Sequence, residues 1–162
     1  MSVVAIKKVG KKFEMAADSI IVSGWTQGKE PNGKMWKIGD LAAGSVGKAA
    51  LAGLFREYIE NHKPKTNNEW GWINHMAEFM KYANAIDNAF KMEDNDFLVA
   101  WKGKAFLLCG TFVQEVKKYH AIGAGMDFAL AALHLGHSAK EACEIACELS
   151  VFCEKPVKVL KA

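Results

Sequence analysis

The chain lacks any apolar run near the ~20 residues that a membrane-spanning helix requires. Its N-terminal residues also include too few apolar side chains for a secretory signal peptide. A strand pattern begins directly behind Met1, with no expected leader. These absences predict a protein with no membrane partner and a cytoplasmic location.

A basic stripe is also missing. The 21 Lys and Arg residues are interspersed with 18 acidic residues, which leaves a net charge of only +3. Nucleic acid is therefore not an expected partner. The sequence contains no internal repeat or low-complexity segment, and 51% of its 162 residues are hydrophobic. We expect a single domain, residues 1–162, with a sizeable core of its own.

Cysteine is scarce, with four residues in all. Cys143 and Cys147 lie one helical turn apart, the spacing of half a metal site. They stand among Ala and Ile on an apolar face, however, and no further pair of His or Cys completes a ligand set. Packing of reduced thiols in the core is the favoured interpretation.

Secondary-structure signals come in segregated blocks. Two strands (2–8 and 11–18) join near Gly10, an extended segment (19–25) follows, 26–34 reads as a loop, and 35–47 as two strands. Helical periodicity over 48–62 and 69–90 precedes a strand pair at 96–110, helices at 126–136 and 138–152, and a last strand at 155–161. This order predicts an α+β fold, a four-layer αββα sandwich with a helix pair outside each of two stacked sheets.

Three segments carry a resemblance to a known family. They are the hairpin ending in "MAAD", the stretch "GKMWKIGDLAAGSVG", and "AIGAGMDFALAAL" followed by "SAKEACEIACELSVF". In order and spacing, over nearly the whole chain, they resemble the N-terminal-nucleophile hydrolases, in particular proteasome β subunits and the HslV protease. The resemblance implies the proteasome-like sandwich and a peptidase that cuts polypeptides inside a ring-shaped compartment.

The same resemblance implies a catalytic set. Ser2, Asp18 and Lys34 stand at equal steps of 16 residues, the relative places of the family's nucleophile, Asp and Lys. Removal of Met1 would make Ser2 the first residue, with its α-amine as the base. Lys34 would favour the alkoxide, Asp18 would hold Lys34, and the Gly44 N–H would face the oxyanion.

Simpler roles stay open for these residues. Ser2 can be a disordered terminal residue, Asp18 a turn cap, and Lys34 a solvated lysine with Lys37 as the competitor for its role. Trp36 can line a substrate pocket or be a buried sheet residue. Phe55 and Tyr58 on the first helix, with the Trp70–Trp72 segment, are expected to contact a neighbouring subunit.

Some positions depart from the family. The nucleophile is Ser where Thr is usual, and Ala124 in "GAG" lacks the hydroxyl that the family's late elbow supplies. In HslV the turn after the last helix binds a monovalent cation through backbone carbonyls, which fall here near Cys147, Ser150 and Cys153. The expected cofactor list is therefore empty except for a monovalent cation such as Na⁺.

The resemblance also implies partners, namely a homo-oligomer of stacked, hexameric rings and an unfoldase ATPase. Two alternatives remain open. One is a catalytically inactive relative that works as an oligomeric binding or inhibitory protein. The other is a hydrolase of small amides with the same fold.

Overall fold

The computed structural model describes residues 1–29 and 33–162. Two antiparallel sheets dominate it, a four-stranded sheet in the order β10-β1-β2-β11 and a five-stranded sheet in the order β5-β6-β7-β8-β9. A separate hairpin pairs β3 with β4. The strand bounds are β1 Val4–Val9, β2 Lys12–Ala17, β3 Ile20–Ser23, β4 Thr26–Lys29, β5 Met35–Ile38, β6 Leu41–Gly47, β7 Asn95–Trp101, β8 Lys104–Cys109, β9 Phe112–Glu115, β10 Tyr119–Ile122 and β11 Lys158–Lys161.

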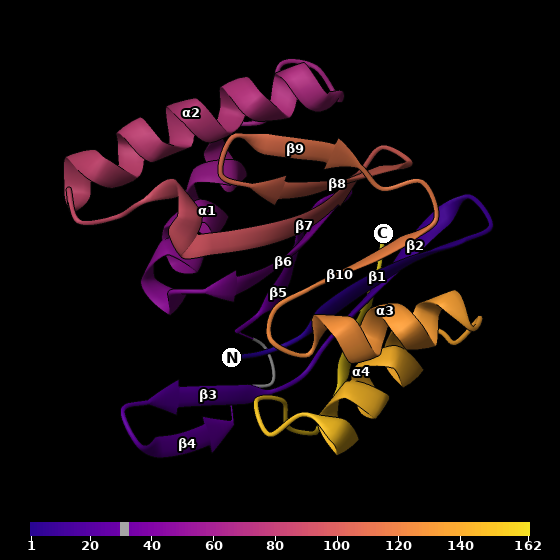
Figure 1. Cartoon of the computed structure of the whole chain (residues 1–162). Coiled ribbons are helices and arrows are strands. Elements are labelled where there is room, and N and C mark those ends of the chain that lie inside the picture. Colours follow the sequence, from indigo (N-terminus) through magenta and orange to yellow (C-terminus); the bar gives the residue numbers. More distant parts are fainter. Residues whose placement is uncertain (30–32) are drawn as a thin grey trace.

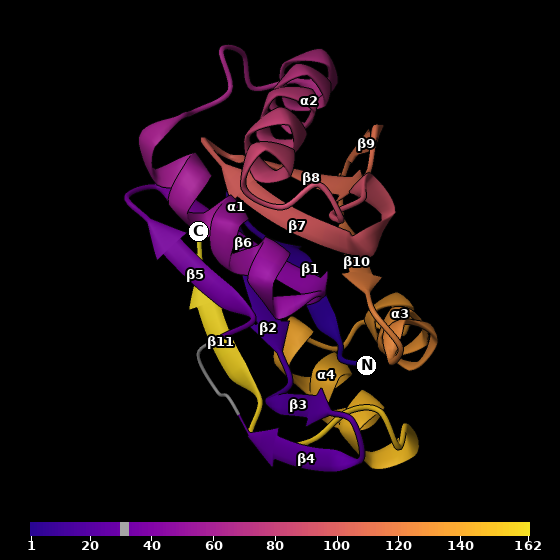
Figure 2. The same cartoon turned by 90° about the vertical axis from the view of Figure 1, so that its left-hand side faces the viewer.

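Helices cover the two outer faces (Figures 1 and 2). Helices α1 (Ala49–Asn61) and α2 (Glu69–Ile86) lie over the five-stranded sheet, whereas α3 (Met126–His134) and α4 (Ala139–Leu149) lie over the four-stranded sheet. A short 3₁₀ helix, η1 (Met92–Asp94), precedes β7. The predicted α+β class and the four-layer αββα sandwich are confirmed.

Strand alternation separates three layers of apolar side chains. On β1, Val4 and Ile6 face the space between the two sheets, while Val3 before the strand and Ala5 face α3 and α4. Successive strand residues point to opposite faces, so each two-sided strand must be apolar throughout. This requirement explains the continuous apolar runs in β1, β7 and β8.

Helices α1 and α2 pack on the five-stranded sheet through aromatic side chains. Phe55 is fully buried and Tyr58 is 6% exposed, and both belong to this core. The expectation that these two residues contact a neighbouring subunit is therefore wrong, because the aromatic side chains of α1 are buried within the protomer. Of the two tryptophans at the start of α2, Trp72 is buried in the same core and Trp70 is exposed.

Local signals place the last two helices as predicted. Ser138 caps α4 by accepting a hydrogen bond from the Glu141 N–H, and the Glu141 carboxylate accepts one from the Ser138 N–H. Such a capping box satisfies two otherwise unpaired donors. Gly136, which follows α3, has φ of +103°, a conformation that glycine adopts without a steric penalty.

The predicted loop at 26–34 is partly a strand. Residues 26–29 form β4, which pairs with β3 across a two-residue turn at Gly24 and Trp25, while 30–32 lie outside the described residues. All four β4 residues are exposed, so neither face of the strand needs apolar side chains. The sequence therefore shows no apolar alternation at this segment. Gly24, with φ of +58°, permits the tight turn that pairs the two strands. Among the described residues, no helix is long and apolar enough to cross a membrane.

One histidine is enclosed in the aromatic core under α1 and α2. His75 is 3% exposed and lies against the rings of Tyr58, Trp72 and Phe55, with centroid distances of 5.2, 5.6 and 6.2 Å. Burial, with smaller contributions from His62 and Lys63, lowers the pKa of His75 from 6.5 to about 4. This imidazole is therefore neutral in the folded protein at pH 7.

We expect His75 to make folding sensitive to acid. A folded-state pKa below the unfolded value gives stability that is complete above pH 6.5 and is lost as the pH falls toward 4. Between pH 7 and pH 5 the loss should be on the order of 2 kcal/mol, because each pKa unit corresponds to about 1.4 kcal/mol. Denaturant unfolding of the wild type and of His75→Phe at both pH values measures it. The matched variant His62→Gln removes only a smaller contribution and should keep most of the wild-type slope, and an unchanged slope in His75→Phe would contradict the assignment.

Candidate active site

The carboxylate of Asp18 ties four chain segments together directly after β2. Its side chain is 0% exposed, and its Oδ1 accepts hydrogen bonds from the Val3 N–H at 2.9 Å and the Lys34 Nζ at 2.6 Å. The other oxygen, Oδ2, accepts from the Ile20 and Glu154 N–H groups, both at 3.2 Å. A buried carboxylate is tolerated when donors and a cation surround it. Asp18 thus caps its own turn through the Ile20 N–H and also anchors three distant parts of the chain.

Lys34 is held beside the N-terminal strand by this carboxylate. Its side chain is only 11% exposed. Burial lowers the pKa of Lys34 from its usual value, and the charge and hydrogen bond of Asp18 oppose that shift. The competitor Lys37 instead donates to the Lys161 carbonyl at 2.9 Å on the exposed surface. The structure therefore brings Lys34, and not Lys37, to Asp18.

Ser2 is fixed by its backbone and is not a frayed terminus. It is 5% exposed, and its carbonyl accepts a hydrogen bond from the Gly125 N–H at 3.1 Å. Gly123 approaches so closely that a Cβ there would lie 2.4 Å from the Ser2 carbonyl oxygen. The "GAG" elbow therefore holds the start of the chain in place through two glycines that admit no side chain.

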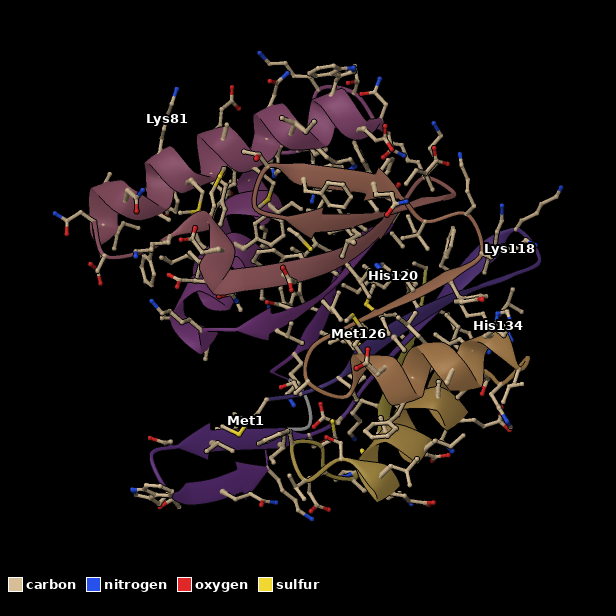
Figure 3. The ribbon with its side chains drawn as sticks, in the orientation of Figure 1. Met1, Lys81, Lys118, His120, Met126 and His134 are labelled. Carbon is tan, nitrogen blue, oxygen red and sulfur yellow. The ribbon has the colours of Figure 1, made fainter. Side chains whose placement is uncertain are left out.

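Ser2 has an unusual backbone conformation, with φ of +146°. Only glycine adopts this region readily, and other residues there cost about 1–3 kcal/mol. The angle φ exists at Ser2 only because the peptide bond to Met1 precedes it. Met1 itself is 57% exposed and lies beside β3, as Figure 3 shows.

Ser2 and Lys34 line one cavity of about 560 Å³, a volume typical of small-ligand and peptide sites. Its walls come from β3, from the start of β5, from the end of β6 and from the first two turns of α1. The lining residues are Met1, Ser2, Ile20, Ile21, Val22, Gly33, Lys34, Trp36, Ser45, Val46, Gly47, Lys48, Ala49, Ala52, Gly53, Arg56 and Asn95. A hydroxyl and a buried ammonium thus share a concave site that can accept part of a chain.

No model of a known protein family matches this sequence, and no curated protein does. Solved structures do match. BPH from Thiobacillus denitrificans, in complex with epoxomicin, has a TM-score of 0.85 and 19% identity over 99% of this chain and 97% of its own. HslV from Trypanosoma brucei has a TM-score of 0.78 and 21% identity over 98% of each chain. Anbu from Yersinia bercovieri has 0.74 and 13% identity over 99% of this chain and 81% of its own.

The chain has the proteasome-like fold of the N-terminal-nucleophile hydrolases. This confirms the resemblance expected from the sequence. At these identities the comparison concerns the fold alone, and the chemistry has to be argued from the residues of this chain.

Gly44, the predicted oxyanion donor, is not among the residues that line the cavity. The N–H of the next residue, Ser45, donates to the Lys34 carbonyl at 2.9 Å, so strand alternation turns the Gly44 N–H the other way, toward Leu98 on β7. A Cβ at Gly44 would lie 2.7 Å from Val4, in the space between the sheets. Its glycine identity therefore reflects close packing of the two sheets.

Gly47 is the glycine of the elbow that does line the cavity, and sequence reasoning passed over it. Its φ is +119°, and a Cβ there would lie 2.1 Å from the Asp94 carbonyl oxygen. Asn95, buried beside it, accepts from the Lys48 N–H at 2.8 Å and donates to the Ser45 Oγ at 3.0 Å. This network fixes the backbone of the elbow at the cavity wall. The second glycine of "AGSVG", which is Gly47, was the sequence feature that could have indicated this position.

Trp36 combines the two roles that the sequence left open. It is 5% exposed and packs edge-on against Phe55 with the ring centroids 6.3 Å apart, yet it also contributes to the cavity wall. Its indole Nε1 is buried and has no hydrogen-bond partner among residues 1–29 and 33–162. The wall at this point is therefore a rigid core side chain.

The three positions expected to offer carbonyls to a cation lie at the end of α4 and in the turn after it. The Ser150 carbonyl accepts a hydrogen bond from the Cys153 N–H at 3.2 Å. The Cys153 sulfur is so close to Gly125 that a Cβ there would lie only 2.5 Å from it. Cys147 stands in the last turn of the helix. The turn supports the elbow that holds Ser2, and Na⁺ binding there stays a prediction.

The Asp18–Lys34 pair should show strong energetic coupling. Asp18→Asn leaves the Lys34 ammonium buried without its anion, which should cost about 3 kcal/mol or more of unfolding free energy. Lys34→Met should cost less, because three backbone N–H groups still bind Asp18. The double variant should lose at least ~1 kcal/mol less than the sum. Denaturant unfolding measures all three, Lys37→Met serves as the exposed control, and strictly additive losses would contradict the coupling.

Proposed function

We propose that the chain is a proteasome- and HslV-like peptidase that uses Ser2 as its N-terminal nucleophile after Met1 is removed. The observation that carries this proposal is the convergence of Ser2 with the Lys34–Asp18 pair at one cavity wall. A serine hydroxyl is a weak nucleophile until a base takes its proton. The α-amine that Met1 removal exposes is such a base, because α-amines titrate near ~8.

The proposed reaction has two balanced steps. The Ser2 Oγ bonds to the carbonyl carbon of the substrate, and its proton passes to the α-amine and then to the departing amide nitrogen as the C–N bond breaks. Water then attacks the resulting ester and gives a proton to the α-amine, which passes it to the Ser2 Oγ as the C–Oγ bond breaks, so that the acid product leaves and the Ser2 hydroxyl is restored. The Lys34 ammonium stabilises negative charge at Oγ, and Asp18 orients it. Gly47 is the candidate backbone donor for the carbonyl oxygen.

The backbone at Ser2 supports the loss of Met1. The positive φ costs energy only while a peptide bond precedes the residue, so cleavage of Met1 relieves that strain. Met1 is exposed and its neighbour is small, which suits an aminopeptidase. Intact mass spectrometry reads this processing directly.

Ser2→Ala should abolish peptide hydrolysis with no loss of folding. The protein is measured with a fluorogenic peptide panel and by thermal shift with epoxomicin, the ligand of the BPH structure. Wild type should lack one Met mass and hydrolyse peptides, and Ser2→Thr should keep or raise the rate, because the added methyl restricts χ1. Undiminished turnover in Ser2→Ala would refute the nucleophile. The circular dichroism spectrum controls for folding.

The alternatives separate in the same experiment. A retained Met1 would leave Ser2 without a free amine and would favour the inactive, oligomeric binding or inhibitory protein. The absence of a hydroxyl at Ala124 also favours that alternative. Hydrolysis of short amides but not of peptides would favour a small-amide hydrolase. Adding Na⁺ to K⁺-depleted and Na⁺-depleted protein tests the proposed cation at the Cys147, Ser150 and Cys153 carbonyls.

We further propose a homo-oligomer, with stacked hexameric rings as the arrangement and an unfoldase ATPase as a partner that feeds it unfolded chains. Exposed apolar side chains at the turn after α4 support an oligomer, and they are Leu149, Val151 and Phe152. Trp25, fully exposed at the tip of the β3–β4 hairpin, is a further contact candidate. A peptidase of this kind uses enclosure to exclude folded proteins.

The 17.8 kDa chain should therefore sediment well above its monomer mass. Val151→Asp should shift the distribution toward the monomer, because it places a charge in an apolar contact. The matched variant Val9→Asp alters an exposed valine at the far hairpin and should leave the assembly intact. Analytical ultracentrifugation measures the masses, and circular dichroism confirms folding. A homogeneous monomer at high micromolar concentration would count against the compartment.

A further inference from the structure

All charged side chains that the described residues place on the cavity wall are cationic. They are Lys34, Lys48 and Arg56. Two of the three charges are neutralised nearby, since Lys34 pairs with Asp18 at 2.6 Å and Lys48 with Asp94 at 2.8 Å. Arg56 enters no ion pair within 4.0 Å across residues 1–29 and 33–162. Among these residues, Arg56 is therefore the charged side chain of the cavity wall that lacks a counter-ion.

The first turns of α1 present this arginine to an open space. Ala49, Ala52, Gly53 and Arg56 share one helical face, and all four line the cavity. The first three are small, and a Cβ on Gly53 would meet nothing within 4 Å. A side chain entering the cavity can therefore reach the guanidinium without meeting bulk from the helix.

The N-terminus of α1 also favours a negatively charged ligand in the cavity. This terminus lies at the cavity, with Lys48 as the N-cap residue, no side-chain cap and no acidic residue in the first turn. Free N–H groups and the helix dipole there favour negative charge. This contribution has the same sign as Arg56 and reinforces it.

We propose that this cavity selects an acidic side chain, Glu or Asp, at the substrate residue whose carbonyl Ser2 attacks. The guanidinium of Arg56 binds the carboxylate, because its planar donors match two carboxylate oxygens. Lys and Arg side chains are disfavoured at the same place by charge repulsion. The proposal rests on the proposed peptidase function, and Arg56 is a specificity residue with no part in the bond-breaking steps.

An apolar preference is the competing outcome, since Ile20, Val22, Val46 and Trp36 also contribute to the wall. These apolar side chains come from β3, β5 and β6, and they offer contacts to the methylene groups of a glutamate. Arg56, on α1, offers a partner for its carboxylate. An apolar wall with one cationic group fits a side chain with methylene groups and a terminal carboxylate.

The test uses peptides that differ only at this residue, with Glu, Gln, Leu or Lys. Wild type should show kcat/KM about tenfold higher for Glu than for Gln, the scale of one charge-assisted contact that is partly exposed. Arg56→Gln should bring the Glu-to-Gln ratio close to one, and Arg56→Glu should favour Lys over Glu. Lys81→Glu makes the same change of charge on α2, where the side chain points away from the protein (Figure 3), and should keep the wild-type ratio.

Binding separates this proposal from the peptidase proposal. Calorimetry with the Ser2→Ala protein needs no turnover, and the Glu peptide should bind about tenfold more tightly than the Gln peptide. A wild type that cleaves nothing while Ser2→Ala keeps this preference would refute only the peptidase. Cleavage with a Leu preference, or equal affinities for Glu and Gln peptides, would overturn the acidic specificity. If Arg56→Glu does not fold, the neutral Arg56→Gln variant decides.

Discussion

The buried carboxylate of Asp18 is the constraint on which the candidate site depends. It receives N–H groups from the N-terminal strand, from the start of β3 and from the turn after α4, and it also holds the Lys34 ammonium. Removal of any one donor leaves the other three in place, whereas removal of the carboxylate frees all four segments. Stability and the placement of the reactive groups are therefore coupled through one side chain.

This arrangement explains why the N-terminus can be part of a site at all. Terminal residues normally fray because few contacts hold them. Here the Val3 N–H donates to Asp18 and the Ser2 carbonyl accepts from Gly125, so both polar groups of the Ser2–Val3 peptide bond are hydrogen-bonded. The glycines of the late elbow permit this close approach. The strained φ of Ser2 is defined only while Met1 precedes it, and the proposed chemistry needs the removal of Met1.

Much of the architecture could be predicted from the sequence because each layer leaves a periodic signal. The apolar stripes of α1 and α2, the continuous apolar strands β7 and β8 and the Ser138 capping box all correspond to observed elements. The strand β4 left no signal, since all its side chains are exposed and its pairing with β3 needs no apolar residue. Phe55 and Tyr58 were assigned to the wrong surface, because an apolar stripe does not say whether it packs within or between chains.

The site residues also divide into those that the sequence could indicate and those that it could not. Ser2, Asp18 and Lys34 could be selected because their spacing resembles that of the family's nucleophile, Asp and Lys, and a shared fold keeps the length of chain between such positions similar. The choice of Gly44 depended on the direction of one N–H group, which alternates from residue to residue along β6. Sequence spacing does not resolve a single step of that alternation. Gly47 and Arg56 could not be found by spacing, because their roles arise from which face of an element borders the cavity.

The pairing of charges also separates two tasks within one cavity. In the proposed mechanism Lys34 has to stay close to Ser2, and an unpaired ammonium there would attract the carboxylate of any acidic side chain and block the proposed nucleophile. The Asp18 carboxylate, which is buried, neutralises the charge of Lys34 through a contact of 2.6 Å. The attraction for anions then lies mainly at Arg56, on the far wall formed by α1. An acidic side chain drawn to that wall would leave its own backbone carbonyl toward Ser2, which is the orientation that hydrolysis on its carboxyl side requires.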